Sequence, residues 1–358
     1  MLEGRLTVNR GGSAACGGLM AVEMHGRASH FVVPCTSLIK KNNAKMKITA
    51  VEPIGISETK AQEIACQLAK YNLEFQCYRD RKEDAATLVE RMKDADIVIV
   101  SNIKITADML SQCPNLKMLD VAFTGLDHID LEYCKAHNIK VVNASGYATE
   151  GVAELAIGLM IDVYRHITVL DADTRNGGTR NNFLGRELRG KRVGIVGTGA
   201  IGARTAQLLQ CFGCEVVAWS RSQRQEVLAM GVTYLPLEEL MRASDIISLH
   251  VPLTAKTHHL ISRELLAICK PTAVLINTAR GNVVDMDALA EALNEGRLAG
   301  AGIDVFEKEP PLAENHPLLH APNCVVVPHV GYATREAFDD RIDIVINNIY
   351  RELNISNS

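Results

Sequence analysis

The chain has 358 residues, enough for two domains of ordinary size, and 47% of them are hydrophobic while 22% are charged. Its 38 basic and 42 acidic side chains give a net charge of −4, which argues against a protein whose main task is to bind a nucleic-acid backbone. No apolar stretch approaches the roughly 18 residues that a membrane-spanning helix requires. The ten cysteines are scattered, as is usual for buried thiols in a reducing compartment. We therefore expect a cytoplasmic protein without a nucleic-acid or membrane partner.

Residues 1–45 differ from the rest of the chain. They contain pairs of glycines and no sustained hydrophobic periodicity, and Glu23 interrupts the only apolar run that could form the core of a secretory signal. Met46 then opens a run of strand-forming residues. We expect residues 1–45 to be an N-terminal extension without a fixed structure, and the folded unit to start near Met46.

From residue 46 onward, short apolar runs alternate with helical segments. The predicted strands of this first unit are Lys47–Val51, Glu74–Tyr78, Asp96–Val100 and Leu116–Ala122. The predicted helices are Ser57–Tyr71, Asp84–Met92 and a long one, Glu150–Asp171, that leaves the unit. Alternation of this kind predicts a parallel sheet in an α/β fold.

A polar loop is predicted over Asp173–Gly190, and the alternation then restarts more strongly. The predicted strands are Arg192–Val196, Glu215–Trp219, Asp245–Val251, Ala273–Asn277, Ala301–Phe306 and Val325–Val327. The predicted helices include Ala200–Cys211, Asp285–Glu295 and a last one, Glu336–Leu353. Six strands with crossover helices are enough for one complete doubly wound dinucleotide-binding domain.

A glycine-rich turn follows the first of these strands. Gly197, Gly199 and Gly202 form the pattern G-x-G-x-x-G, which is weak evidence alone but here stands between an apolar strand and an apolar helix. Gly197 would permit the tight turn, Gly199 the approach of a pyrophosphate, and Gly202 the close packing of helix and strand. The helix that begins at Ala200 and Ile201 would present N–H groups to the anion.

The end of the next strand discriminates between the two nicotinamide dinucleotides. An NAD site usually places Asp or Glu there to bind the ribose hydroxyls, whereas this chain has Ser220, Arg221 and Ser222. An arginine and two hydroxyls suit a 2′-phosphate, so NADP(H) is favoured. NAD(H) stays open as the alternative, with Arg221 pointing into solvent.

Further polar residues stand at the carboxyl ends of other strands, where an open parallel sheet forms its ligand crevice. Arg280, Glu309 and His329 could together face a substrate. Each alone would more simply be structural, as a buried ion pair or a core histidine. Three suitable residue types at three strand ends favour the functional interpretation.

At this point the sequence resembles the D-isomer-specific 2-hydroxyacid dehydrogenase family, from Met46 to about Leu353. The motifs that carry the resemblance are Phe123–Asp127 with Ile129–Leu131, Val152–Glu154, Gly197–Gly202, His250–Thr254, Asn277–Gly281, Gly302–Phe306 with Glu309-Pro310, and Pro328–Gly331. The resemblance implies a Rossmann coenzyme domain, residues 146–330, inserted into a smaller flavodoxin-like α/β substrate-binding domain, residues 46–145 and 331–358. It also implies a homodimer formed through the coenzyme domain.

The resemblance further implies catalytic roles for three residues. Arg280 would hold the substrate carboxylate and polarise the keto oxygen, and His329 would donate a proton to that oxygen. Glu309 would orient the imidazole and stabilise its charged form. Backbone amides near Gly125 and Leu126 would help to hold the substrate. Further cofactor contacts are implied at Thr124, Val251, Pro252, Thr278, Ala279, Asp304 and Gly331.

The expected function is therefore an NAD(P)-dependent oxidoreductase that interconverts 2-keto acids and D-2-hydroxy acids, with glyoxylate and hydroxypyruvate as first candidates and no metal. Ser220 departs from the aspartate common in NAD-using members, and Glu309 departs from the glutamine of formate dehydrogenases. Tyr147 and Tyr332 are candidates for limiting substrate size. The alternatives are a phosphoglycerate dehydrogenase-like enzyme and, from another class, a dinucleotide-sensing binding protein similar to the corepressors of this superfamily.

Overall fold

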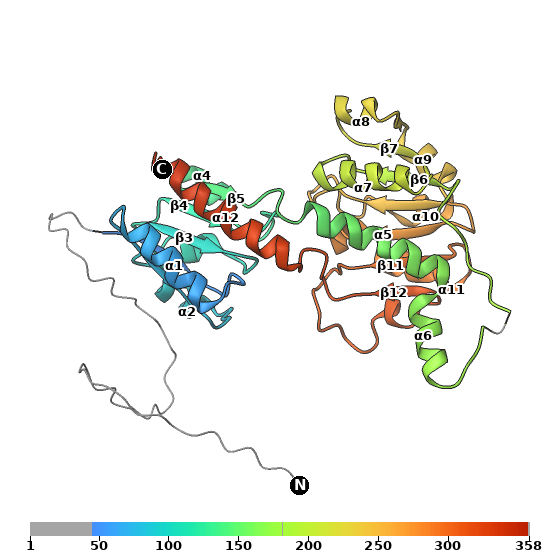
Figure 1. Cartoon of the computed structure of the whole chain (residues 1–358), viewed down its shortest axis with the longest axis horizontal. Coiled ribbons are helices and arrows are strands. Elements are labelled where there is room, and N and C mark those ends of the chain that lie inside the picture. Colours follow the sequence, from blue (N-terminus) through green and yellow to red (C-terminus); the bar gives the residue numbers. More distant parts are fainter. Residues whose placement is uncertain (1–44, 181, 357–358) are drawn as a thin grey trace, which may run out of the picture.

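The chain folds into two lobes, each built around one parallel β-sheet, as Figure 1 shows. The computed structural model describes residues 45–180 and 182–356. The expected N-terminal extension, apart from Lys45, lies outside the described residues. None of the helices in the described part of the chain is long and apolar enough to cross a membrane.

The first lobe contains a five-stranded sheet in the order β2-β1-β3-β4-β5, with all neighbours parallel. Its strands are β1 (Met46–Ala50), β2 (Leu73–Cys77), β3 (Ile97–Val100), β4 (Met118–Val121) and β5 (Lys140–Asn143). Its helices are α1 (Glu58–Ala69), α2 (Ala85–Met92), α3 (Ala107–Leu110) and α4 (Leu131–Ala136). The central strands β3 and β4 are buried throughout, as expected where helices cover both faces of a parallel sheet.

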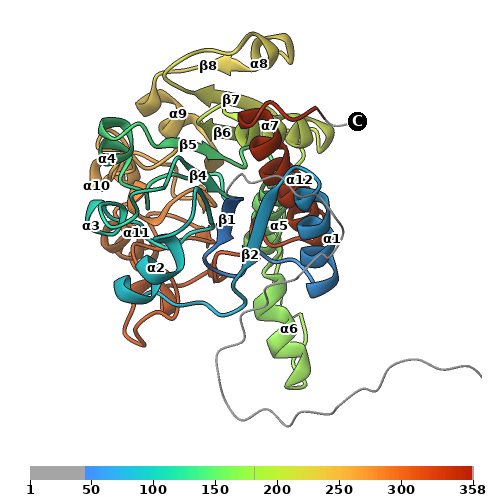
Figure 2. The ribbon, with the colours of Figure 1, turned by 90° about the vertical axis from the view of Figure 1, so that its left-hand side faces the viewer.

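A helix from the far end of the chain completes this lobe. α12 (Arg335–Glu352) contributes Ile342, Val345 and Ile349 to the same core as β1, β3 and β4. It lies beside α1 on one side of the sheet, where the rings of Tyr71 and Tyr350 are 5.8 Å apart (Figure 2). The first lobe therefore combines two segments that are distant in the sequence.

The second lobe contains a seven-stranded parallel sheet in the order β12-β11-β10-β9-β6-β7-β8. Its strands are β6 (Arg192–Val196), β7 (Glu215–Trp219), β8 (Thr233–Tyr234), β9 (Ile246–Leu249), β10 (Val274–Asn277), β11 (Gly300–Ile303) and β12 (Cys324–Val326). Its helices are α7 (Ala200–Cys211), α8 (Gln225–Ala229), α9 (Leu237–Ala243), α10 (Arg263–Ala267) and α11 (Met286–Asn294), with 3-10 turns at Gly281–Val283 and Pro317–Leu319. The strand order reverses between β6 and β9, which is where a doubly wound sheet binds its ligand.

The connection between the lobes corrects one prediction. The single helix expected over Glu150–Asp171 is two helices, α5 (Thr149–Arg165) and α6 (Ile167–Arg175), and α6 extends into the expected polar loop. They are separated at His166, whose φ of 51° is left-handed. The Asp162 carboxylate accepts a hydrogen bond from the backbone N–H of Thr168 at 2.9 Å, and this contact stabilises the new helix start.

The predicted fold class is confirmed, although two strands were missed. The first sheet has the flavodoxin-like order and the second the Rossmann order that the resemblance implied. β5 was not predicted because it is a partly exposed edge strand that begins with a lysine. β8 has only two residues, so the second sheet contains seven strands and not six.

Candidate active site

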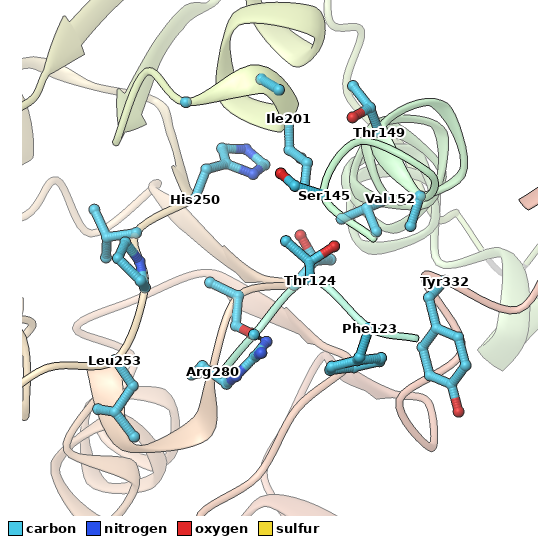
Figure 3. A pocket seen from close by; sticks show the side chains of 18 of the residues that line it. Phe123, Thr124, Ser145, Thr149, Val152, Ile201, His250, Leu253, Arg280 and Tyr332 are labelled. Carbon is cyan, nitrogen blue, oxygen red and sulfur yellow. Dashed lines mark hydrogen bonds between the residues drawn. The ribbon is translucent and has the colours of Figure 1, made fainter. Parts of the chain in front are cut away.

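A cavity of about 520 Å³ lies between the two lobes, at the carboxyl ends of the strands. The second lobe lines it with residues 199–201 at the start of α7, with residues that directly follow β9, β10 and β11, and with His329. The first lobe lines it with the segment that follows β4, and residues 145–149 with Val152 lie at the junction. Figure 3 shows Arg280 beside Thr124 and Phe123, with His250 and Ile201 farther along the cavity.

The glycine turn between β6 and α7 has the shape that an anion-binding loop requires. Gly197 has a φ of +100°, and a Cβ there would lie 2.6 Å from the carbonyl oxygen of His250. A Cβ at Gly202 would clash with the carbonyl oxygen of Gly197, so only glycine permits this close packing. Gly199 caps α7 without a side chain, and a Cβ there would meet no atom within 4 Å. The N-terminus of α7 is therefore open to an anion.

The tip of β7 lies beside this turn, because the N–H of Gly197 donates to the carbonyl oxygen of Trp219 at 2.7 Å. Ser220 follows and is half-buried, whereas Arg221 and Ser222 are exposed. Sequence reasoning missed Arg224, whose Nη1 donates to the carbonyl oxygen of Thr198 in the glycine turn at 3.3 Å. The signal available in the sequence was a second arginine three residues after Arg221.

Arg280 follows β10 and reaches across to the first lobe. Its Nε and Nη2 both lie 3.4 Å from Oδ1 of Asp127, and its Nη1 donates to the carbonyl oxygen of Ala279 at 2.7 Å. The guanidinium lies 5.6 Å from the centre of the Phe123 ring. Residues from both lobes thus hold the cation at the cavity.

His329 and Glu309 meet although they follow different strands. Nδ1 of His329 and Oε1 of Glu309 are 2.9 Å apart. When the carboxylate accepts a hydrogen bond from the N–H at Nδ1, Nε2 is the ring nitrogen that can exchange a proton with a ligand. His329 has a left-handed φ of 52°, a conformation that costs an ordinary residue about 1 kcal/mol.

Asp304, which directly follows β11, fixes the backbone around this histidine. Its carboxylate accepts hydrogen bonds from the N–H groups of Val330 at 2.6 Å and Gly331 at 3.0 Å, and its carbonyl oxygen accepts one from His329 at 2.8 Å. Burial raises the pKa of Asp304, while the bonds from Val330 and Gly331 act in the opposite direction. Asp304 therefore supports the unusual backbone that presents His329.

An aromatic wall closes the cavity on the side of the first lobe. The ring of Phe123 is 6.1 Å from that of His329, 5.4 Å from that of Tyr332 and 6.5 Å from that of Tyr147. Burial raises the pKa of Tyr147 to about 12, so this phenol stays neutral. Both tyrosines that the sequence suggested as size-limiting line the cavity.

His250 also lines the cavity, although sequence reasoning used it only as the start of a motif. Its Nε2 lies 2.9 Å from Oγ of Ser248, and burial lowers its pKa to about 4. At neutral pH this ring is uncharged. Arg280 is the only Lys or Arg side chain among the described residues that line the cavity.

The residues present fit a bound dinucleotide. The open N-terminus of α7 suits a pyrophosphate, and the buried Oγ1 of Thr278 has no hydrogen-bond partner among the described residues. Such an unpartnered polar atom beside a cavity suits a polar ligand.

The structure brings together many of the residues that the sequence singled out. Those that line the cavity are Thr124, Gly125, Leu126, Gly199, Ala200, Ile201, Val251, Pro252, Thr278, Ala279, Arg280, Asp304 and His329. Those outside its lining are Gly197, Gly202, Ser220, Arg221, Ser222, Glu309 and Gly331. Of the second group, Glu309 contacts His329, Gly331 contacts Asp304, and the others lie in the glycine turn or at the β7 tip beside it.

Comparison with known proteins gives consistent matches. Residues 157–331 match the model of the D-isomer specific 2-hydroxyacid dehydrogenase NAD binding domain. A glyoxylate reductase of Thermococcus litoralis is 39% identical over 287 residues, which are 77% of this chain and 86% of that protein. A hydroxypyruvate reductase of Thermotoga maritima is 40% identical over 272 residues, 75% of this chain and 88% of that protein.

A solved structure is similar over a comparable length. An acyclic imino acid reductase in complex with NADPH and D-arginine has a TM-score of 0.79 and 32% sequence identity. The match covers 86% of this chain and 97% of that one.

Proposed function

The chain belongs to the D-isomer specific 2-hydroxyacid dehydrogenase family, and we propose that it reduces glyoxylate, hydroxypyruvate and similar short 2-keto acids. Its reaction class is the interconversion of a 2-keto acid and a D-2-hydroxy acid with a nicotinamide dinucleotide. The observation that carries the proposal is one cavity at which Arg280 and the Glu309–His329 pair stand together. A carboxylate-binding cation and a proton donor are what a 2-keto acid requires.

Arg280 binds the substrate carboxylate in this proposal, helped by backbone amides near Gly125 and Leu126. His329 transfers a proton from Nε2 to the keto oxygen, and Glu309 stabilises the imidazolium through Nδ1. The aromatic wall limits the length of the substrate and keeps water from the reacting carbon.

The glycine turn, Thr278 and Asp304 would hold the cofactor, which when bound supplies a hydride to the carbonyl carbon. We favour NADP(H) over NAD(H). Ser220 stands where a carboxylate would select NAD, and Arg221 offers an exposed cation at the β7 tip. Arg224 places a second guanidinium beside the turn, where it also pairs with Glu226 at 2.6 Å. The bound NADPH of the imino acid reductase is consistent with this choice.

The charges at the cavity favour a substrate with a single negative charge. Arg280 is the one Lys or Arg among the described lining residues, and Asp127 adds a negative charge beside it. A phosphorylated keto acid would bring further charges without a cation to pair with them. This argues against a phosphoglycerate dehydrogenase-like substrate.

We also propose that residues 146–330 form the cofactor-binding domain and that residues 46–145 and 331–358 form the substrate-binding domain. A cytoplasmic homodimer is the proposed form in the cell. Exposed apolar side chains on and near α6 support the dimer: Ile167 is 51%, Val169 56% and Leu184 81% exposed.

The test is an assay of 2-keto acids with NADPH and NADH, with chiral analysis of the product. We expect D-2-hydroxy acids from glyoxylate homologues and hydroxypyruvate, and at least about tenfold lower kcat/KM on 3-phosphohydroxypyruvate. Arg280→Ala and His329→Ala should each lose roughly 10²–10⁴-fold in kcat/KM, while Arg242→Ala, an exposed arginine on α9, should not. Cofactor binding without any turnover would instead indicate a dinucleotide sensor.

A further inference from the structure

Asp127 belongs to the family-like motif after β4, yet neither the sequence nor the proposed function gives it a role. Its Oδ1 lies 3.4 Å from both Nε and Nη2 of Arg280, which is 153 positions away and on the other lobe. The pair is only partly exposed, with 22% of the arginine side chain and 43% of the aspartate side chain accessible. Asp127 thus faces one edge of the guanidinium.

The contacts of Arg280 account for three of its five N–H groups. Nε and one N–H of Nη2 face Asp127, and one N–H of Nη1 donates to the carbonyl oxygen of Ala279 at 2.7 Å. Among the described residues, one N–H on each terminal nitrogen is left without a partner. Two donors on neighbouring nitrogens are what a two-point contact with a carboxylate requires.

The chain around Asp127 is built to allow this contact. A Cβ at Gly125 would lie 2.7 Å from Oδ1 of Asp127 and would clash with Nη2 of Arg280, so the glycine leaves room for the pair. The backbone just after Asp127 is fixed to Ile105. The N–H of Ile105 donates to the carbonyl oxygen of His128 at 2.9 Å, and the carbonyl oxygen of Ile105 accepts from the N–H of Asp130 at 3.1 Å.

We propose that Asp127 is a positioning residue for Arg280, holding the guanidinium so that its two remaining N–H groups are ready for the substrate carboxylate. This inference rests on the proposed function, because it requires a substrate with a carboxylate that Arg280 binds. A free arginine side chain has several rotatable bonds, and ordering it on binding opposes affinity. Asp127 reduces that cost before the substrate arrives.

The experiment compares Asp127→Asn and Asp127→Ala with the wild type in glyoxylate reduction. Asparagine keeps an oxygen acceptor without the charge, and alanine removes both. We expect the KM for glyoxylate and the Ki for oxamate to rise together, in the order wild type, asparagine, alanine, by up to about fivefold for a pair this exposed. The kcat and the KM for NADPH should change little. Glu132→Gln removes one exposed charge from α4 and should behave as the wild type.

The outcomes separate this inference from the function on which it rests. A wild-type protein that reduces no 2-keto acid would count against the proposed function. If the wild type is active, an unchanged or lowered glyoxylate KM in Asp127→Ala would overturn the positioning role. A parallel fall in kcat and in NADPH affinity would show a general structural defect and would also overturn it.

Discussion

Glu309 and His329 form a hydrogen bond of 2.9 Å between Oε1 and Nδ1, and the histidine lines the cavity between the lobes. The glutamate is half exposed, whereas the histidine side chain is only 18% exposed. The carboxylate therefore stands on the solvent side of the ring and leaves Nε2 free of this contact. In the proposed mechanism, the charge of Glu309, and not its bulk, is then the feature that matters for proton transfer.

Glu309→Gln should lower the kcat/KM for keto-acid reduction by about 10–100-fold. The amide can still contact Nδ1 but no longer stabilises the protonated ring that reduction requires. The loss should therefore fall mainly on kcat, because Arg280 still binds the substrate carboxylate. Steady-state kinetics of glyoxylate reduction with NADPH measure kcat and KM separately.

Glu307→Gln is the matched control, because it removes a carboxylate charge only two residues from Glu309. Glu307 contacts a different histidine, His316, at 3.3 Å. The kcat of this variant and its KM for glyoxylate should match those of the wild type. A kcat in Glu309→Gln equal to that of the wild type would show that the carboxylate does not support the proton donor.

Cofactor choice should respond to the tip of β7. Ser220→Asp places a carboxylate where NAD-binding sites carry one, and it would repel a 2′-phosphate. We expect the ratio of kcat/KM for NADPH to that for NADH to fall at least about tenfold. Arg221→Ala should lower the use of NADPH more than that of NADH.

Arg242→Ala controls for the loss of a positive charge on the same lobe, because Arg242 is exposed on α9. A wild-type preference for NADH, or an unchanged ratio in Ser220→Asp, would argue that the β7 tip does not bind the 2′-phosphate of NADPH.

The proposed dimer should depend on the apolar surface of α6. None of the residues of this helix is buried, and the ring of Phe183 lies 4.5 Å from that of His166 at its start, which brings Leu184 close to the same surface. In Figure 1, α6 projects from the second lobe at its lower edge. The double change Ile167→Asp and Val169→Asp should convert a dimer to a monomer in sedimentation velocity. Leu228→Asp, on the distant helix α8, should leave the assembly unchanged. A monomeric wild type would refute the proposal.

Local patterns predicted much of this architecture and part of the candidate site. The turn at Gly197 could be predicted from the sequence, because its need for glycine follows from the local backbone conformation. The contact between Asp127 and Arg280 could not, because it depends on how two separate sheets approach each other. The helix break at His166 was also missed, since one left-handed residue, followed by a helix whose Thr168 N–H bonds to Asp162, leaves the apolar periodicity almost intact.

Asp120, in the middle of β4, provides a prediction about stability. It is fully buried, its Oδ1 accepts a hydrogen bond from Nδ2 of Asn348 at 3.0 Å, and its Oδ2 has no partner among the described residues. Burial raises the pKa of Asp120 from 3.8 to about 8, against the opposing effects of Asn348 and Arg351. The folded protein therefore prefers the protonated acid.

This carboxyl should make the protein less stable as pH rises. Below the unfolded pKa of 3.8 the acid is neutral in both states, and its contribution to stability is fully present. Between 3.8 and about 8 the unfolded state releases the proton while the folded state retains it, so the contribution is lost progressively. The upper limit of the slope is about 1.4 kcal/mol per pH unit.

Asp120→Asn removes this titration and keeps an oxygen for Asn348. Urea unfolding at several pH values should show a variant of similar stability near pH 4 that becomes increasingly more stable than the wild type toward pH 8. The control is Asp339→Asn, an exposed position on α12, the helix that covers β4. A difference between Asp120→Asn and the wild type that stays constant with pH would mean that the buried carboxyl is ionised in the folded protein. Among the described residues, only Asn348 donates a hydrogen bond to the Asp120 carboxyl, and Arg351 donates to Asn348. These two residues would then stabilise the charge of the carboxylate more effectively than this one direct contact suggests.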